Sequence, residues 1–294
     1  MFKVRDDLYL IQTVDFITPV VDDPYTFGRI AAINSLSDVY AMGGTPITAM
    51  SVLMYNCSID TSIISEMMQG AADELGKVKC TLLGGHTVED PEIKLGFGVT
   101  GFVTDGKYYR NCDLRDGDIL IYTKPLGIGI LSTALKGELA TENGRKVLTD
   151  AMLLSNYEAS KILRKYDVSS VTDVTGFGLA GHSFEMAKGS GLSIEIFGDS
   201  ASLLPSVKEY CEMGIIPAGA YHNRQFLLKD YQISDMLKKF EMIFFDPQTS
   251  GGLLIGVAER DSYGLLDALK NLGYQDSSVV GRVVNFKEKY LSIV

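Results

Sequence analysis

Apolar and polar positions follow strand and helix periods through the first third of the chain. An apolar, β-prone run predicts a strand over residues 8–14 that ends at Asp15. A helix is expected over about 24–42, because Asp23 suits an N-cap, Pro24 the first helical position, and Gly43-Gly44 a C-terminal end. The same reasoning predicts further elements, namely strands over 47–55, 80–83 and 93–103 and a helix over 60–76.

The second part of the chain repeats this alternation after a polar stretch with two turns, near 104–107 and 116–118. We place a domain boundary there, which gives an N-terminal lobe over 1–105 and a C-terminal lobe over 106–294. Strands are predicted over 119–122, 169–173, 192–197, 242–246, 252–257 and 278–285, and helices over 128–136, 145–164 and 178–188. Some strands are two-faced and others continuously apolar, so the expected class is α/β, with two lobes of mixed sheets and helices packed on them.

Composition excludes several kinds of partner. The 294 residues carry 27 basic and 37 acidic side chains, a formal net charge of −10, and no basic run, so nucleic acid is not an expected partner. No apolar run approaches the roughly 18 residues that cross a bilayer, and the N-terminus lacks the apolar core of a signal peptide. We therefore expect a cytoplasmic protein with no membrane partner.

The cysteines and histidines do not suggest a metal or disulfide framework. No CxxC pair is present, and the residues are scattered as Cys57, Cys80, Cys112, Cys211, His86, His182 and His222. Reduced, mostly buried thiols are the interpretation we favour.

Three aspartates are the candidates for chemistry. Asp15 and Asp173 end apolar strands, where α/β proteins place ligands, and Asp38 lies inside an apolar helix with Asn34 one turn before it. Each one alone is more often a solvated or capping residue. Three carboxylates at the edges of apolar elements, however, favour Mg²⁺ bridging them to a nucleotide triphosphate, because this cation prefers oxygen ligands and keeps phosphates in its shell.

Two glycine-rich segments, 83–87 and 249–252, could approach phosphates with their amides. Neither is a P-loop, and each alone is more often a tight turn or a bulge. His86 has no paired carboxylate spacing that argues for a general base. Asn223-Arg224 could clamp an anion, although an exposed Arg is usually only solvated.

Longer motifs run in order along nearly the whole chain. They are QTVDF at 12–16, DDPY at 22–25, GRIAA at 28–32, NSLSDVYAMGG at 34–44, GGHT at 84–87, TKPLG at 123–127, TDVTGFGL at 172–179 and DPQTSGG at 246–252. Together they resemble selenophosphate synthetase (selenide, water dikinase) closely, and the block over 12–44 is the most specific. Related ATP-dependent enzymes of the aminoimidazole ribonucleotide synthetase superfamily share the two-lobed architecture but match that block less well.

The resemblance implies a reaction and a site. ATP, selenide and water would give selenophosphate, AMP and orthophosphate, with ATP in a groove at the interface of a homodimer formed by the N-terminal lobes and its phosphates held by metal ions on aspartates. Carried over to this sequence, Asp38 and Asp173 are the expected metal ligands. The expected nucleotide contacts are Thr13, Asp15, Asp38, Gly84, Gly85, His86 and Thr87.

The chain departs from the family pattern at its N-terminus. Family members begin with a glycine-rich segment that carries a catalytic Cys or selenocysteine and a Lys, followed by a metal-binding Asp turn, and we expect these upstream of Met1. None of the four cysteines matches a family motif position, so no catalytic residue is assigned and selenophosphate synthesis by this chain alone is not expected. Two alternatives stay open: a nucleotide-binding regulatory paralogue, or another superfamily enzyme that makes a purine intermediate or phosphorylates thiamine phosphate.

Overall fold

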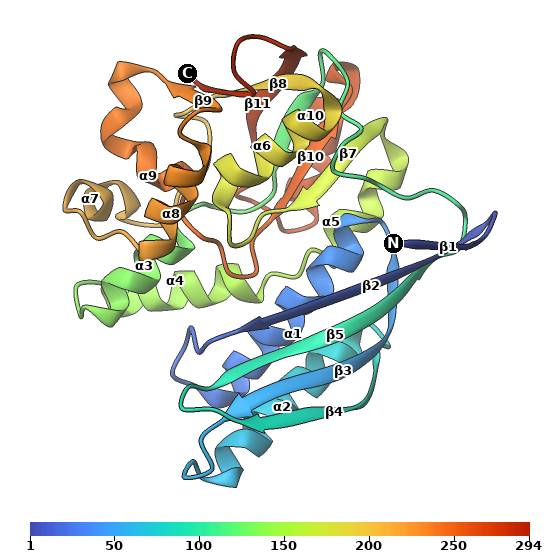
Figure 1. The fold of residues 1–294 in the computed structure, drawn as a ribbon, viewed down its shortest axis with the longest axis vertical. Coiled ribbons are helices and arrows are strands. Elements are labelled where there is room, and N and C mark those ends of the chain that lie inside the picture. The colour runs from blue at the N-terminus through green and yellow to red at the C-terminus, as the bar shows by residue number, and fades with distance from the viewer. The chain divides into compact units, whose positions relative to one another are not determined.

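The computed structural model describes residues 1–294 and forms two compact units (Figure 1). Unit 1 comprises residues 1–108 and 152–156, and unit 2 comprises 109–151 and 157–294. Helices and mixed sheets make up both units, as the sequence predicts. In neither unit is a helix both long enough and apolar enough to span a membrane.

Unit 1 is a five-stranded sheet with two helices. Its elements are β1 (Phe2–Arg5), β2 (Leu8–Ile17), α1 (Pro24–Ala41), β3 (Thr45–Tyr55), α2 (Thr61–Lys77), β4 (Thr81–Glu89) and β5 (Lys94–Val103). The strand order is β1-β2-β5-β3-β4, and only β3 and β4 run parallel. Helices α1 and α2 cover one face of the sheet and leave the other face open (Figure 1).

Local chemistry explains where the two helices of unit 1 begin. The side chain of Asp23 accepts a hydrogen bond from the backbone of Thr26 (2.7 Å), and that of Asp60 accepts one from Ser62 (2.8 Å). Both predicted caps are thus confirmed. Helix α1 is buried on nearly all sides and packs against β2, β5 and α2.

Unit 2 is built on a seven-stranded sheet in the order β7-β10-β6-β11-β8-β12-β9. Its strands are β6 (Ile119–Tyr122), β7 (Val168–Asp173), β8 (Leu192–Ile196), β9 (Tyr231–Ile233), β10 (Leu253–Val257), β11 (Ser278–Asn285) and β12 (Leu291–Ile293). The helices after residue 108 are α3 (Ile128–Lys136), α4 (Glu142–Leu153), α5 (Tyr157–Ile162), α6 (Gly178–Ser190), α7 (Val207–Glu212), α8 (Ala218–Leu227), α9 (Glu241–Phe244) and α10 (Glu259–Asn271), with short 3₁₀ segments at Leu163–Lys165 and Asp235–Phe240.

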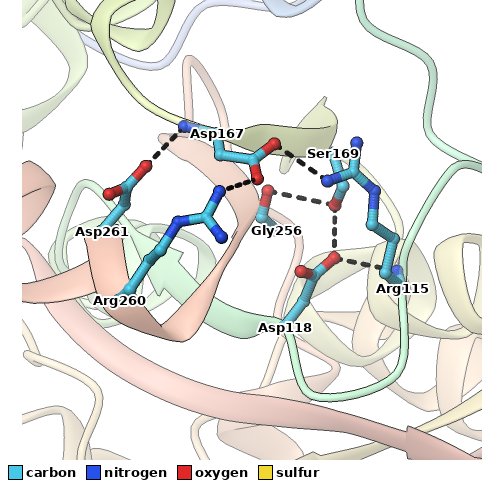
Figure 2. A network of polar contacts seen from close by, with 7 residues as sticks. All are labelled: Arg115, Asp118, Asp167, Ser169, Gly256, Arg260 and Asp261. Atoms are coloured by element: carbon cyan, nitrogen blue, oxygen red, sulfur yellow. Dashed lines mark hydrogen bonds and ion pairs between the residues drawn. The ribbon is translucent and has the colours of Figure 1, made fainter.

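A hydrogen-bond network joins the starts of two strands in the sheet of unit 2. Strands β6 and β7 are both antiparallel to β10, so they start at the same end of the sheet. There the Asp167 carboxylate accepts from Arg115 (2.9 Å) and Arg260 (2.6 Å), and buried Asp118 accepts from Ser169 and from the Arg115 backbone (Figure 2). The candidate site residue Asp173 lies at the opposite end of the sheet, where β6 and β7 end.

Some predicted elements are wrong. Residues 145–164 form two helices rather than one, because the chain leaves the helix between Leu153 and Tyr157. Residues 241–244 form the short helix α9 rather than a strand, since a short buried apolar run looks the same in either structure. Residues 84–87 lie within strand β4 and not in a tight turn, although the strand register shifts at Leu83, as a bulge would require. Strand β1 and helix α10 are absent from the prediction.

Candidate functional site

The first group of candidate residues lies between β2 and α1 in unit 1. Thr13 and Asp15 are two apart on β2, so both side chains point to the face that α1 covers. The Thr13 hydroxyl donates to the Asp38 carboxylate, and the Asn34 amide donates to Asp15 Oδ2 (3.3 Å). The structure therefore brings together Thr13, Asp15 and Asp38, with Asn34 as a supporting residue.

The carboxylates of Asp15 and Asp38 lie between β2 and α1, and their hydrogen-bond partners, Asn34 and Thr13, carry no positive charge. Burial, and then the negative charge of Asp38, raise the pKa of Asp15 from 3.8 to about 6. A raised pKa of this origin means that a positive charge placed between the two carboxylates would be favourable. Since Mg²⁺ commonly uses one or two protein carboxylates plus substrate phosphates, the pair fits such an ion. The chain itself forms no group of three or more His, Cys, Asp or Glu that could hold a metal.

The Gly84–Thr87 segment lies elsewhere on the same sheet. Strands β5 and β3 separate β2 from β4. The strand pairing runs Phe16–Gly96–Val52–His86, one position away from Asp15, so His86 and Asp15 point to opposite faces. Residues 84–87 are exposed, with His86 on the open face. Within one copy, the structure does not bring this segment together with Asp15.

The open face of the unit 1 sheet is apolar. Exposed fractions of its side chains are 61% for Val14, 50% for Phe16, 56% for Met50 and 48% for Val88. The residues that pair with them across the sheet include Gly96 and Gly98, which add no side chain. An exposed apolar area of this kind usually marks an interaction surface.

Asp173 belongs to unit 2, where it ends β7 and is 5% exposed. The chain then turns through 174–177 into α6, with Gly178 at a φ of +69°. His182 Nε2 accepts from the Thr175 amide (3.1 Å), and the Asn223 side chain donates to Gly176 O (2.8 Å). This turn is held by side chains from two helices.

The second glycine-rich segment supports Asp173 from below. A Cβ on Gly251 would lie 1.8 Å from Val174 O, so only glycine fits there. The Gly252 amide donates to the Tyr122 hydroxyl (3.1 Å), and Gly252 O accepts from the Val174 amide (2.9 Å). The Gly252 amide is therefore already bonded within the protein, and the segment braces the end of β7.

Lys124 is a buried charged residue of this region that the sequence did not lead us to expect. It is fully buried at the end of β6, and its Nζ donates to Ser250 O (2.6 Å). Burial lowers the pKa of Lys124 from 10.5 to about 7, although the nearby negative charge of Asp173 acts in the opposite direction. Its place in TKPLG, between buried strand and proline, is the signal that could have indicated a buried lysine.

Two other candidates are engaged within the protein. Arg224 is paired with Glu241 (2.6 Å), and the Asn223 side chain donates to two backbone carbonyls, so both side chains already have partners within the protein. The cysteines are free thiols: Cys57 is exposed and Cys112 half-buried. Burial raises the pKa of Cys80 and of Cys211 to about 11, which disfavours the reactive thiolate.

The sequence matches two known domain families, and the fold resembles that of solved structures. The AIR synthase related protein N-terminal domain family matches residues 1–103, and the corresponding C-terminal domain family matches 115–293. The fold resembles thiamine monophosphate kinase from Aquifex aeolicus (TM-score 0.70, 18% identity, 97% of this chain and 87% of that one). It also resembles hydrogenase maturation protein HypE from E. coli (TM-score 0.74, 18% identity, 95% and 80%). At these identities the structures confirm the fold alone.

Sequence relatives are much closer. The selenide, water dikinase of Clostridioides difficile is 43% identical over 295 residues, which cover 100% of this chain and 85% of that protein. The selenide, water dikinase 2 of Peptoclostridium acidaminophilum is 43% identical over 294 residues, and that of Campylobacter jejuni is 42% identical, each with the same coverage. The chain therefore belongs to the selenide, water dikinase family.

Proposed function

We propose that this chain provides the nucleotide- and metal-binding scaffold for converting ATP, selenide and water into selenophosphate, AMP and orthophosphate. The observation that carries the proposal is the Asp15–Asp38 pair between β2 and α1, in a chain 43% identical to selenide, water dikinases. Asp38 would hold a metal ion, and Thr13 and Asp15 would contact the nucleotide. Asp173 would be a further metal ligand. Mg²⁺ would neutralise the triphosphate, about four negative charges, beside the carboxylates of Asp15 and Asp38.

The nucleotide site is proposed to need two copies of the chain. Asp15 and His86 point to opposite faces of one sheet, so a single copy cannot present both to one ligand through the sheet. The exposed apolar face with Val14, Phe16 and Met50 gives a surface on which a second copy can pack. In such a homodimer, Gly84–Thr87 of each copy would lie at the interface, where the family resemblance puts the nucleotide.

Sedimentation of matched variants tests the dimer. Met50→Glu places a charge on the open face and is expected to shift the protein to monomer at micromolar concentrations. Met236→Glu is the control, because Met236 is 85% exposed but lies in unit 2. A wild-type monomer, or a Met50→Glu dimer of unchanged stability, would contradict this interface.

Calorimetric titration of ATP tests the metal site. Wild type should bind ATP with Mg²⁺ and bind it far more weakly without. Asp38→Asn and Asp173→Asn should each weaken Mg·ATP binding by about 10-fold or more, because each removes a charged ligand. Asp235→Asn, which removes an exposed carboxylate far from these residues in sequence, should leave affinity unchanged. Unchanged affinity in both ligand variants would refute the assignment.

We also propose that residues 1–294 alone do not make selenophosphate. Selenide phosphorylation needs a nucleophile or selenium carrier and a cation beside the transferred group. Two of the four cysteines are buried with raised pKa, and neither Cys57 nor Cys112 lies in a family motif. In a version joined to the Cys- or selenocysteine-bearing segment of the family, turnover of selenide rather than thiamine phosphate separates this proposal from the alternative superfamily enzyme. Nucleotide binding without any turnover in that version would favour the regulatory paralogue.

A further inference from the structure

A buried serine on α1 reaches into the sheet beside the candidate nucleotide carboxylate. The hydroxyl of Ser35, a residue 1% exposed, lies 3.0 Å from Asp15 O on β2 and accepts from the Phe97 amide on β5 (3.1 Å). Asp15 and Phe97 are directly paired across these two strands. A helix side chain therefore bridges the strand pair at the residue that carries the carboxylate (Figure 1 shows α1 behind β2 and β5).

The hydroxyl is shared among three backbone groups. It also lies 3.0 Å from Ala31 O, one turn earlier on α1, so its single proton serves either Ala31 O or Asp15 O while its oxygen serves Phe97. Buried backbone groups need partners, so the contact with Phe97 satisfies an amide at this point of the ladder.

Strand β5 approaches β2 closely beside Asp15, at Gly96. A Cβ on Gly96 would lie 1.8 Å from Asp15 O and 2.4 Å from the Cα of Phe16, so β5 approaches β2 too closely there for a side chain. The Asp15 backbone is thus held by β5 on one side and by the Ser35 hydroxyl on the other. Asn34, the neighbouring residue on α1, holds the Asp15 carboxylate.

We propose that Ser35 is a positioning residue for the nucleotide–metal site, which fixes the Asp15 backbone so that its carboxylate faces Asp38. This rests on the proposed function, since the site that it positions is the one assigned to nucleotide and metal. Asn34 orients the side chain and Ser35 orients the backbone from which it projects. Replacing a group that orients a binding carboxylate in this way typically lowers the affinity for the ligand, although the group does not touch the ligand.

Ser37 offers a matched control for a purely structural role. It lies on the same helix, is 2% exposed, and its hydroxyl accepts from Asn156 Nδ2 (2.9 Å) rather than contacting β2. Ser35→Ala and Ser37→Ala each remove one buried hydroxyl from α1. Both are expected to lower the unfolding temperature, so stability alone does not separate the two roles.

The test measures Mg·ATP affinity by calorimetry in both variants and in a cycle with Asp15→Asn. Ser35→Ala should weaken Mg·ATP binding by about 10-fold, as removal of a supporting group does. Ser37→Ala should stay within about twofold. In the Asp15→Asn background, Ser35→Ala should have little further effect, because both changes act on one carboxylate. Equal losses in the two serine variants, or effects of Ser35→Ala and Asp15→Asn that multiply independently, would overturn the inference.

A second readout needs no nucleotide. Ser35→Ala should speed hydrogen exchange of the Phe97 amide and shift the NMR signals of Asp15, whereas Ser37→Ala should leave both unchanged. If wild type failed to bind Mg·ATP, the proposed function would be wrong, and this readout would decide the positioning claim by itself. Unaltered Phe97 exchange and Asp15 signals in Ser35→Ala would refute that claim.

Discussion

The crossing of α1 and α2 gives the sharpest stability prediction, because Gly28 of α1 lies against the backbone of α2. A Cβ on Gly28 would lie 1.8 Å from Met67 O and 2.7 Å from the Met67 carbonyl carbon, both backbone atoms that cannot rotate away. Contacts under 3.0 Å are essentially never seen for real Cβ atoms, so Gly28→Ala must push the helices apart by about 1 Å.

Two opposing contributions set the size of the effect. Alanine favours the helix over glycine by about 1 kcal/mol. Overpacking a tight contact costs about 1–3 kcal/mol and more where backbone must move, so the free energy of unfolding should fall by about 2 kcal/mol. Because α1 carries Asn34, Ser35 and Asp38, the same displacement should weaken Mg·ATP binding.

Gly76→Ala is the matched control in α2. Apart from the adjacent residues and nearby backbone of α2 itself, no atom lies within 4 Å of a Cβ built at Gly76, so this change keeps the helix preference without the clash. It should leave stability unchanged or raise it by up to about 1 kcal/mol. Urea unfolding followed by circular dichroism measures both variants. If Gly28→Ala were as stable as Gly76→Ala, the close crossing of these helices would be refuted.

Three further changes probe charge and close packing. Burial raises the pKa of Asp246 from 3.8 to about 7, so its contribution to stability is present below pH 3.8 and is lost as the pH rises through 7. The free energy of unfolding of Asp246→Asn, measured in urea, should therefore rise relative to wild type by on the order of 2–3 kcal/mol from pH 5 to pH 8, and parallel pH curves would contradict this. Glu74, 7% exposed, accepts from Arg29 and Lys77, so Glu74→Ala should lower the free energy of unfolding by about 2 kcal/mol in thermal unfolding. Glu92→Ala, which removes an exposed ion-pair partner of Lys94, should lower it by under about 0.5 kcal/mol, and equal losses would show that burial does not matter. Gly251→Ala, whose Cβ would meet Val174 O, should destabilise unit 2 by about 2 kcal/mol or more, and Gly176→Ala, with open space, by under about 1; a stable Gly251→Ala protein would refute the brace beneath Asp173.

Local signals in the sequence predict the elements that end in distinctive chemistry. Asp23-Pro24 and Asp60 start their helices as expected, and the strand over 278–285 matches β11. The strand alternation also explains why Asp15 belongs with Asp38, although β2 continues to Ile17 instead of ending at Asp15. These features depend on residues within one turn or one strand.

Features that depend on distant partners could not be predicted in this way. Gly84–Thr87 is typical of a turn, but β3 supplies a parallel partner that holds it as a strand. The run over 241–244 is apolar enough for a strand, yet it forms a helical turn in the core. The contact of Ser35 with the sheet has no local signal in the sequence, because its partners on β2 and β5 are 20 and 62 residues away.

We propose, as the central point, that residues 1–294 supply the nucleotide–metal scaffold of selenophosphate synthesis without the nucleophile. Phosphorus NMR of ATP, Mg²⁺ and selenide tests it directly, first with residues 1–294 and then with the same residues joined to the Cys- or selenocysteine-bearing segment that the family resemblance predicts. We expect no selenophosphate from residues 1–294, selenophosphate with AMP and orthophosphate from the joined protein, and loss of product when Asp38→Asn is introduced. Selenophosphate from residues 1–294 alone, or undiminished product in the joined Asp38→Asn protein, would contradict the account.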